Sequence, residues 1–209
     1  MNSRLKKGLT YFKNFTYKKY EKLFHTLNDH QYPHTLFVAC SDSRVSPEML
    51  TNSVPGEVFT IRNIANTIPS FNESHYDLTT MAAIEYAIQV LNVEQIIVCG
   101  HSNCGGCAAA LAGTKHLLNL PYTQKYLEPL EGIREIIEEK YADKDALTKA
   151  TLMEKVNAAE QLKHLYEYPE IRKRIDNGKL IIEAWHYDIG SGTILVYDEK
   201  AKSYQLPDE

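Results

Sequence analysis

The chain has 209 residues, of which 44% are hydrophobic and 24% charged, a composition typical of a globular domain with a sizeable core. The formal net charge of −4 at pH 7 argues against a broad nucleic-acid-binding surface, because such surfaces are basic. No apolar run approaches a membrane span, and no apolar segment follows the basic N-terminus, so we expect a cytoplasmic protein without a signal peptide or membrane contact.

Residues 1–30 predict an N-terminal helical arm, followed by a single domain over residues 31–209. Apolar side chains recur at helical spacing, as at Leu5, Leu9 and Phe12. The first twenty residues contain six basic side chains and no acid. A transit peptide or membrane-surface helix is one reading, but we favour an arm that packs on the domain or on a second subunit.

The segments that follow alternate between strand and helix patterns. The apolar run Thr35–Cys40 predicts a strand buried on both faces, as in a parallel sheet. Further strands are predicted at residues 57–62, 95–100, 179–185 and 193–197. The turn at residues 190–192 predicts that the last of these returns as an antiparallel hairpin at the sheet edge.

Helices are predicted between these strands, at residues 79–92 and 107–112 and over much of the charged stretch 120–175. In that stretch Leu162, Leu165 and Ile171 are expected to face the core. Strands that alternate with helices predict an α/β fold with a mainly parallel sheet.

Three potential metal ligands lie at the ends of predicted strands. Cys40 ends the first strand, His101 directly follows the strand at 95–100, and Cys104 comes three residues later. Sites in parallel sheets form beyond the carboxyl ends of the strands, so these side chains can converge if the two strands are neighbours. Three Cys and His ligands plus an open position are typical of catalytic zinc. An inert buried cysteine and a chance His-x-x-Cys remain the alternatives.

Asp42 and Arg44 strengthen the metal hypothesis. They lie two residues apart in the loop after Cys40, where they can form an ion pair that keeps Asp42 ionised and oriented. The alternative is an ordinary solvated surface pair.

The cysteines also allow other interpretations. Cys104 and Cys107 form a C-x-x-C pair that could be redox-active, and a structural zinc site could serve binding rather than catalysis. A thiol phosphatase built on Cys40 and Arg44 is disfavoured, because the spacing is too short and Asp42 would repel phosphate. Cys99 lies inside a predicted strand and is expected in the core.

Five segments resemble motifs of the β-class carbonic anhydrases and occur in the family's order. They are CSDSRV at 40–45, PGEVFTIRNIAN at 55–66, AIEYA at 83–87, GHSNCGG at 100–106 and WHYDI at 185–189. The resemblance covers roughly residues 31–195. It implies a four-stranded parallel core sheet with an added antiparallel edge strand. It also implies one zinc ion per chain held by Cys40, His101 and Cys104, with Asp42 and Arg44 as the catalytic pair beside it.

The resemblance also implies a substrate pocket and an assembly. Pocket residues for carbon dioxide and bicarbonate carry over to Gln31, Phe59, Ile64, Tyr86 and Gly105. Family members form homodimers or dimers of dimers, with active sites at the subunit interface and helical arms that wrap the partner. Gln31 matches the plant-like, open-site branch. The bicarbonate-regulated branch has Trp and Gly where this chain has Phe37 and Ala39, although Arg62 and Tyr187 match its regulatory site.

The implied reaction is the reversible hydration of carbon dioxide to bicarbonate and a proton by zinc-bound hydroxide. Zinc lowers the pKa of bound water toward about 7, but two thiolates cancel the charge of the ion, so we expect activity to rise at alkaline pH. Hydrolysis of carbon disulfide or carbonyl sulfide at the same site is an alternative.

Each polar side chain receives an expected role in that reaction. Gln31 would donate a hydrogen bond to the developing bicarbonate oxygen, and Asp42 would accept the hydrogen of the nucleophile. Arg44 would hold Asp42 away from the metal; if released, Asp42 could close the site as a fourth ligand. No proton shuttle is assigned, because the candidates qualify by residue type alone: His75, His116, His164 and His186.

Overall fold

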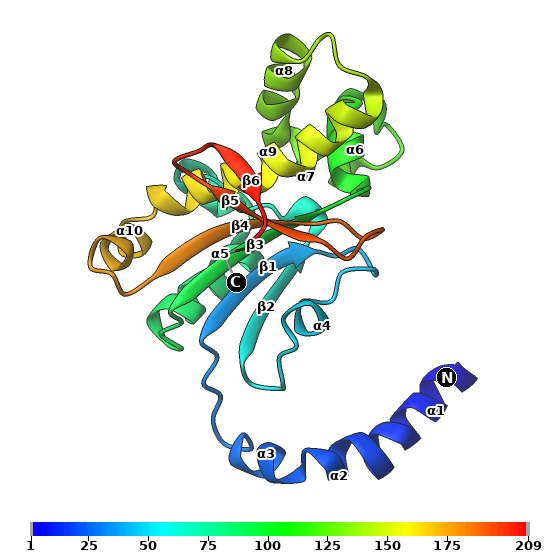
Figure 1. The fold of residues 1–209 in the computed structure, drawn as a ribbon, viewed down its shortest axis with the longest axis vertical. Coiled ribbons are helices and arrows are strands. Elements are labelled where there is room, and N and C mark those ends of the chain that lie inside the picture. The colour runs from blue at the N-terminus through cyan, green and yellow to red at the C-terminus, as the bar shows by residue number, and fades with distance from the viewer. Residues whose placement is uncertain (1, 208–209) are drawn as a thin grey trace.

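The computed structural model describes residues 2–207, and its centre is one six-stranded sheet in the order β2-β1-β3-β4-β5-β6 (Figure 1). The strands are β1 Thr35–Cys40, β2 Val58–Asn63, β3 Gln95–His101, β4 Ile181–Tyr187, β5 Ile194–Asp198 and β6 Ser203–Gln205. β2, β1, β3 and β4 are parallel, while β5 and β6 are antiparallel to their neighbours. The four-stranded parallel core is confirmed. The expectation of one antiparallel edge strand was short by one strand, because β6 pairs with β5 and forms the edge.

The register of the parallel strands places the predicted metal ligands at one edge of the sheet. Cys40 at the end of β1 pairs with Asn63 at the end of β2, and β1 also pairs with β3 along most of its length. β3 ends at His101, which pairs with Tyr187. The carboxyl ends of the four strands therefore lie close together.

The core fills both faces of the sheet because β1 and β3 are buried on both sides. Leu36 and Val38 pack with Ile96 on the face covered by α5, α9 and α10. The alternate residues Phe37 and Ala39 pack on the opposite face, in a smaller cluster that Leu50 of α4 joins. Burial of Leu162, Leu165 and Ile171 confirms the predicted core-facing positions.

The domain contains eleven helical segments after β1 in the part of the chain that the structure describes. They are α4 Pro47–Thr51, η2 Ile64–Asn66, η3 Phe71–Tyr76, α5 Leu78–Gln89, α6 Gly105–Leu111, η4 Thr114–His116, α7 Pro121–Leu127, η5 Glu128–Leu130, α8 Glu131–Lys140, α9 Ala146–Glu167 and α10 Pro169–Asp176. The long helix α9 starts where Asp145 accepts a hydrogen bond from the Thr148 N–H. It ends before Pro169, which disfavours helical geometry in the preceding residue.

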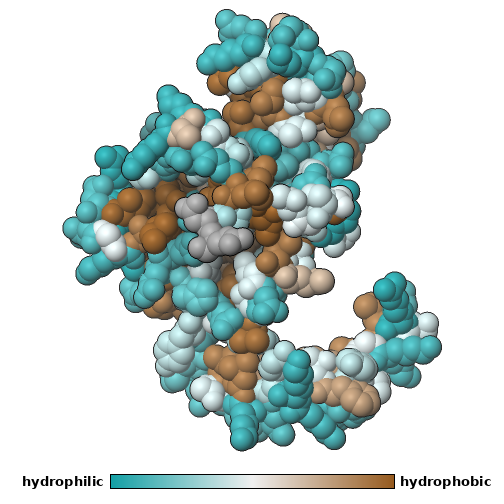
Figure 2. Space-filling view, in the orientation of Figure 1, coloured by the Kyte–Doolittle hydropathy of each residue, from teal (hydrophilic) through white to brown (hydrophobic). Residues whose placement is uncertain are grey.

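The N-terminal segment forms a curved helical arm that extends away from the sheet (Figure 1). Its elements are α1 Ser3–Tyr11, η1 Phe12–Thr16, α2 Tyr17–Lys19 and α3 Glu21–Thr26, and their main contacts are with one another. Figure 2 shows hydrophobic side chains on the surface of this arm. Leu5, Leu9 and Phe15 of the arm are 58 to 64% exposed. Within residues 2–207, none of the helices is both long and apolar enough to cross a membrane.

Candidate functional site

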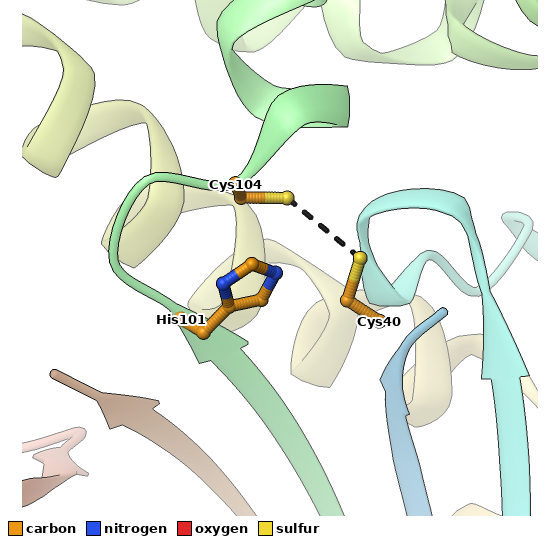
Figure 3. Close-up of side chains that lie close together, drawn as sticks. All are labelled: Cys40, His101 and Cys104. Carbon is orange, nitrogen blue, oxygen red and sulfur yellow. Dashed lines mark hydrogen bonds between the residues drawn. The ribbon is translucent and has the colours of Figure 1, made fainter. Parts of the chain in front are cut away.

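Cys40, His101 and Cys104 converge at the carboxyl edge of the sheet (Figure 3). Cys40 and His101 are the last residues of β1 and β3, and Cys104 is the residue that precedes the first turn of α6. One potential ligand atom from each residue lies within 4.8 Å of the other two, and all three side chains are buried. The strand register and the short loop from His101 to Cys104 therefore assemble three metal-binding side chains from segments about 60 residues apart.

The chemistry and spacing of these groups fit a zinc ion. The two sulfur atoms lie 3.9 Å apart, and a tetrahedral zinc with Zn–S bonds of about 2.3 Å would hold them about 3.8 Å apart. His101 Nδ1 lies 3.0 Å from the Ser102 carbonyl oxygen, which can only accept, so Nδ1 carries the hydrogen and Nε2 keeps a lone pair. That Nε2 atom is buried and has no hydrogen-bond partner in the described chain, as expected of a metal ligand.

Burial and hydrogen bonding disfavour the thiolate forms of Cys40 and Cys104. The hydrogen bond between the Cys40 and Cys104 side chains, together with burial, raises the pKa of Cys40 to about 12. The hydrogen bond with Cys107 contributes most to a similar rise in the pKa of Cys104, to about 12. A metal ion would reverse this effect by favouring the thiolates. Thiolates are the nucleophiles in thiol and redox chemistry, so the raised pKa values disfavour those alternatives. The convergence of three potential ligands favours metal binding.

The remaining cysteines have structural surroundings. Burial raises the pKa of Cys99 to about 12, and its side chain packs in the smaller core cluster with Phe37. Cys107 is buried in the helical cluster beside α6 and accepts a hydrogen bond from Asn157 Nδ2 at 3.7 Å.

Arg44 forms a bidentate ion pair with Asp42. Nε donates to Asp42 Oδ1 at 2.9 Å and Nη2 donates to Oδ2 at 2.7 Å, while the Arg44 backbone N–H also donates to Oδ1. These bonds hold the pKa of Asp42 well below its usual range. Arg62 donates to the carbonyl oxygens of Cys40 and Asp42, so it fixes the backbone of the same loop.

Two of the predicted pocket residues, Ile64 and Gly105, lie beside the cluster. Gly105 directly follows Cys104, and Ile64 begins the helical turn after β2. A Cβ atom added at Gly106 would lie 2.9 Å from Ile64 Cγ2 and 3.0 Å from Ala65 Cβ. Glycine at position 106 therefore lets α6 approach the turn that carries Ile64.

The other three predicted pocket residues are not brought to this cluster within one chain. Phe59 pairs with Leu36, four residues before Cys40, a separation of about 13 Å along the strand. Its ring lies 6.0 Å from that of Tyr86, so these two form a separate aromatic group. Gln31 is exposed and precedes β1, whose other end carries Cys40.

Sequence analysis missed three buried polar residues on one face of α9 that hold the loops around the cluster. Glu154 Oε1 accepts the Cys104 N–H at 3.1 Å, Asn157 Nδ2 donates to the Ala65 carbonyl at 2.8 Å, and Gln161 Oε1 accepts the Ile68 N–H at 2.7 Å. Their spacing of three and four residues could have revealed them, because it places them on the same helical face as the core residues Leu162 and Leu165.

Two of the candidate shuttle histidines have buried or backbone partners. His186 Nε2 lies 3.1 Å from Glu154 Oε2, and His164 Nδ1 donates to the Ile68 carbonyl at 2.6 Å. His75 and His116 are exposed. Nothing in this arrangement assigns a proton shuttle.

Known proteins share both the sequence and the fold. A family model described as carbonic anhydrase matches residues 35–194. The chain is 35% identical to a carbonic anhydrase of Helicobacter pylori (strain J99) over 210 residues, covering 97% of this chain and 93% of that protein. The structure of the β-carbonic anhydrase CcaA superposes with a TM-score of 0.94 at 34% identity, covering 99% of this chain and 92% of that one.

A second solved relative has a stated assembly. One of the tetrameric β-carbonic anhydrases from the filamentous ascomycete Sordaria macrospora superposes with a TM-score of 0.80 at 30% identity, covering 91% of this chain and 93% of that one. Matched over nearly its whole length by such relatives and over residues 35–194 by the family model, the chain belongs to the β-class carbonic anhydrases, enzymes whose general reaction is the hydration of carbon dioxide.

Proposed function

We propose that this chain catalyses the reversible hydration of carbon dioxide to bicarbonate and a proton at one zinc ion bound by Cys40 Sγ, His101 Nε2 and Cys104 Sγ. The observation that carries the assignment is the buried, unpartnered His101 Nε2 beside two thiols whose separation suits zinc. When bound there, zinc would supply a Lewis acid that lowers the pKa of a coordinated water.

Asp42 and Arg44 prepare the nucleophile in this proposal. Because Arg44 keeps Asp42 ionised, the Asp42 carboxylate can accept a hydrogen from the attacking oxygen and orient it toward carbon dioxide. The same ion pair keeps the Asp42 side chain from turning toward the three proposed ligands. Asp42 would therefore not occupy the position that a metal held by these three residues would keep for the reacting water.

The substrate pocket is completed by a second copy of the chain. Ile64 and Gly105 would form the part of the pocket that one chain contributes to its own site. Gln31, Phe59 and Tyr86 lie too far from the cluster of their own chain, and Gln31 and Tyr86 are exposed, the latter by 44%. In a homodimer they would reach the partner's site, where the Gln31 amide would donate to the developing bicarbonate oxygen.

The arm would pack on the same partner. Residues 1–30 form this arm and residues 31–209 the catalytic domain in our proposal. The exposed apolar side chains of the arm would be buried against a second subunit, which explains why they lie on the surface of a single chain. The tetrameric relative suggests that two such dimers can pair further.

Removal of single ligands tests the zinc site. We expect about one zinc per wild-type chain, and little zinc or hydration activity in Cys40→Ser and Cys104→Ser proteins, because a hydroxyl is a poor substitute for a thiolate ligand. Cys99→Ser is the matched control and should keep its zinc, since Cys99 lies in the core. Elemental analysis and stopped-flow hydration assays at pH 7 to 9 provide both readouts. A Cys104→Ser protein that retains zinc and activity would refute the ligand assignment.

A further inference from the structure

A buried carboxylate–imidazole pair lies one contact away from the metal cluster. Glu154 of α9 and His186 of β4 are 4% and 3% exposed, and His186 Nε2 lies 3.1 Å from Glu154 Oε2. Buried ionisable groups are costly unless their polar atoms are hydrogen-bonded. The hydrogen bond between Glu154 and His186 therefore offsets part of the cost of burying both side chains.

The second oxygen of Glu154 reaches the backbone of a proposed zinc ligand. Oε1 accepts the Cys104 N–H at 3.1 Å. The carboxylate thus uses one oxygen for His186 and the other for Cys104, and it connects strand β4 to the loop that carries the ligand.

Close packing fixes Glu154 relative to the sheet. A Cβ atom at Gly100 would lie 3.1 Å from the Glu154 carbonyl oxygen and 3.3 Å from Ala158 Cβ. Only glycine at position 100 lets α9 approach β3 this closely, one residue before His101. Glu154, which accepts the Cys104 N–H, is therefore held at a fixed distance from β3, the strand that also carries His101.

The edge strand β6 supports the other member of the pair. The Tyr204 hydroxyl donates to the Lys155 carbonyl oxygen at 2.8 Å, and the Tyr204 ring meets the His186 ring edge-on, with centroids 6.2 Å apart. The His186 side chain on β4 is thus enclosed by α9 and β6.

Cys104 needs such an external support because its loop is not part of a regular element. Asn103, the preceding residue, has a positive φ of 56°, and the helical segment of α6 begins only at Gly105. The hydrogen bond to Glu154 therefore helps set the direction in which the Cys104 sulfur points.

We propose that Glu154, anchored by His186, is a positioning residue that holds Cys104 Sγ in place for the metal shared with Cys40 and His101. This inference rests on the proposed zinc site. If Glu154 has this role, its removal should make the protein lose metal faster than wild type. Groups that orient metal ligands typically change metal affinity by about 10- to 100-fold.

The rate of zinc release to a chromogenic chelator, measured on the zinc-loaded full chain, tests this role. Glu154→Met removes the acceptor at similar size, and we expect zinc release to be about 10-fold faster or more. Glu154→Gln keeps a carbonyl oxygen for the Cys104 N–H, so release should stay within about twofold of wild type. Cobalt substitution gives a second readout, because displacement of Cys104 would change the thiolate-to-cobalt absorption bands.

Gln161→Met is the matched control for general loss of a buried hydrogen bond. Gln161 lies on the same face of α9 and also accepts a backbone N–H, but from Ile68 rather than from a proposed ligand. The Gln161→Met substitution should lower the free energy of unfolding without accelerating zinc release. Equal acceleration in Gln161→Met and Glu154→Met would overturn the positioning role, as would unchanged release in folded Glu154→Met.

His186→Phe decides the case if Glu154→Met does not fold. It removes the anchor and leaves the acceptor in place, so release should accelerate severalfold, and unchanged release would contradict the proposal. A wild-type protein that binds no zinc would instead refute the proposed zinc site, on which the role of Glu154 depends.

Discussion

Arg44 forms hydrogen bonds to both loops that carry the proposed zinc ligands. Its guanidinium binds both oxygens of Asp42, and Nη2 also donates to the Asn103 carbonyl oxygen at 3.0 Å. Asp42 follows Cys40, whereas Asn103 lies between His101 and Cys104. One side chain therefore orients the carboxylate and also fixes the distance between the loops.

Loss of Arg44 should free Asp42 and disable the enzyme. In Arg44→Ala we expect hydration activity to fall by about two orders of magnitude, because an orienting acid–base group contributes on that scale. Arg44→Lys keeps the charge without the planar fork and should fall in between. Stopped-flow hydration measures the loss, and the spectrum of the cobalt-substituted protein reports whether a carboxylate has joined the metal. Full activity in Arg44→Ala would contradict this role of the pair.

The convergence of the three potential metal ligands was predictable at this scale, whereas the contacts that hold their loops were not. Cys40 and His101 follow apolar runs, so their placement at strand ends could be predicted from the sequence. Glu154 lies 50 residues from Cys104. Its contact depends on the rotation of α9 and on the close approach at Gly100, which no local pattern encodes.

Among the elements, the parallel strands were predicted within two residues because their apolar runs are long and bounded by turns. Predicted strands at 95–100 and 179–185 correspond to β3 Gln95–His101 and β4 Ile181–Tyr187. β6 was missed because it has three residues, two of them exposed, and so lacks an apolar pattern. The long helix α9 was predicted only as part of a helical stretch, since its buried polar face depends on partners from distant loops.

Glu131 joins two elements of the helical region that follows α6. Oε1 accepts hydrogen bonds from the Thr114 backbone N–H and hydroxyl, at 2.8 and 2.6 Å, and Oε2 accepts from Arg134 Nε at 2.6 Å. The bond from the Thr114 hydroxyl contributes most to lowering the pKa of Glu131 to about 2. The carboxylate therefore stabilises the connection between η4 and α8 only while it is ionised.

This lowered pKa predicts a stability contribution that disappears in acid. It is fully present above the ordinary glutamate pKa of 4.5 and is lost as the pH falls toward about 2. Glu131→Gln should lower the free energy of unfolding at pH 7 by about 1 kcal/mol, a modest value because the pair is partly exposed. Urea unfolding at pH 7 and near pH 3 should show the difference shrinking in acid. A difference that is the same at both pH values would count against this assignment.

For the whole molecule, the predicted pocket divides into two groups that one chain does not bring together. Ile64 and Gly105 lie at the cluster, while Phe59 lies about 13 Å away along β2. Tyr86 of α5 packs with Phe59. The family resemblance predicted which residues belong to the pocket, and the structure shows that Gln31, Phe59 and Tyr86 lie away from the cluster of their own chain. The exposed apolar arm is consistent with the same assembly.

Mixing two inactive variants tests whether sites are shared between subunits. Cys104→Ser would lack the metal, and Gln31→Ala would lack the proposed hydrogen-bond donor for the partner's site. After unfolding and refolding together, half of the dimers would be hybrids with one intact site, so we expect recovery of about a quarter of wild-type activity. A chain carrying both substitutions, refolded with Cys104→Ser, is the control and should stay inactive. No recovery in the first mixture would place Gln31 in its own chain's site.

The central claim is that Cys40, His101 and Cys104 hold one zinc ion, and anomalous diffraction at the zinc absorption edge tests it most directly. Crystals of the enzyme grown with zinc should show one strong peak per chain, about 2.3 Å from the sulfur atoms of Cys40 and Cys104 and about 2.0 to 2.1 Å from His101 Nε2. A metal-free cluster in such crystals, or a peak bound instead by Cys99 or Cys107, would contradict the account.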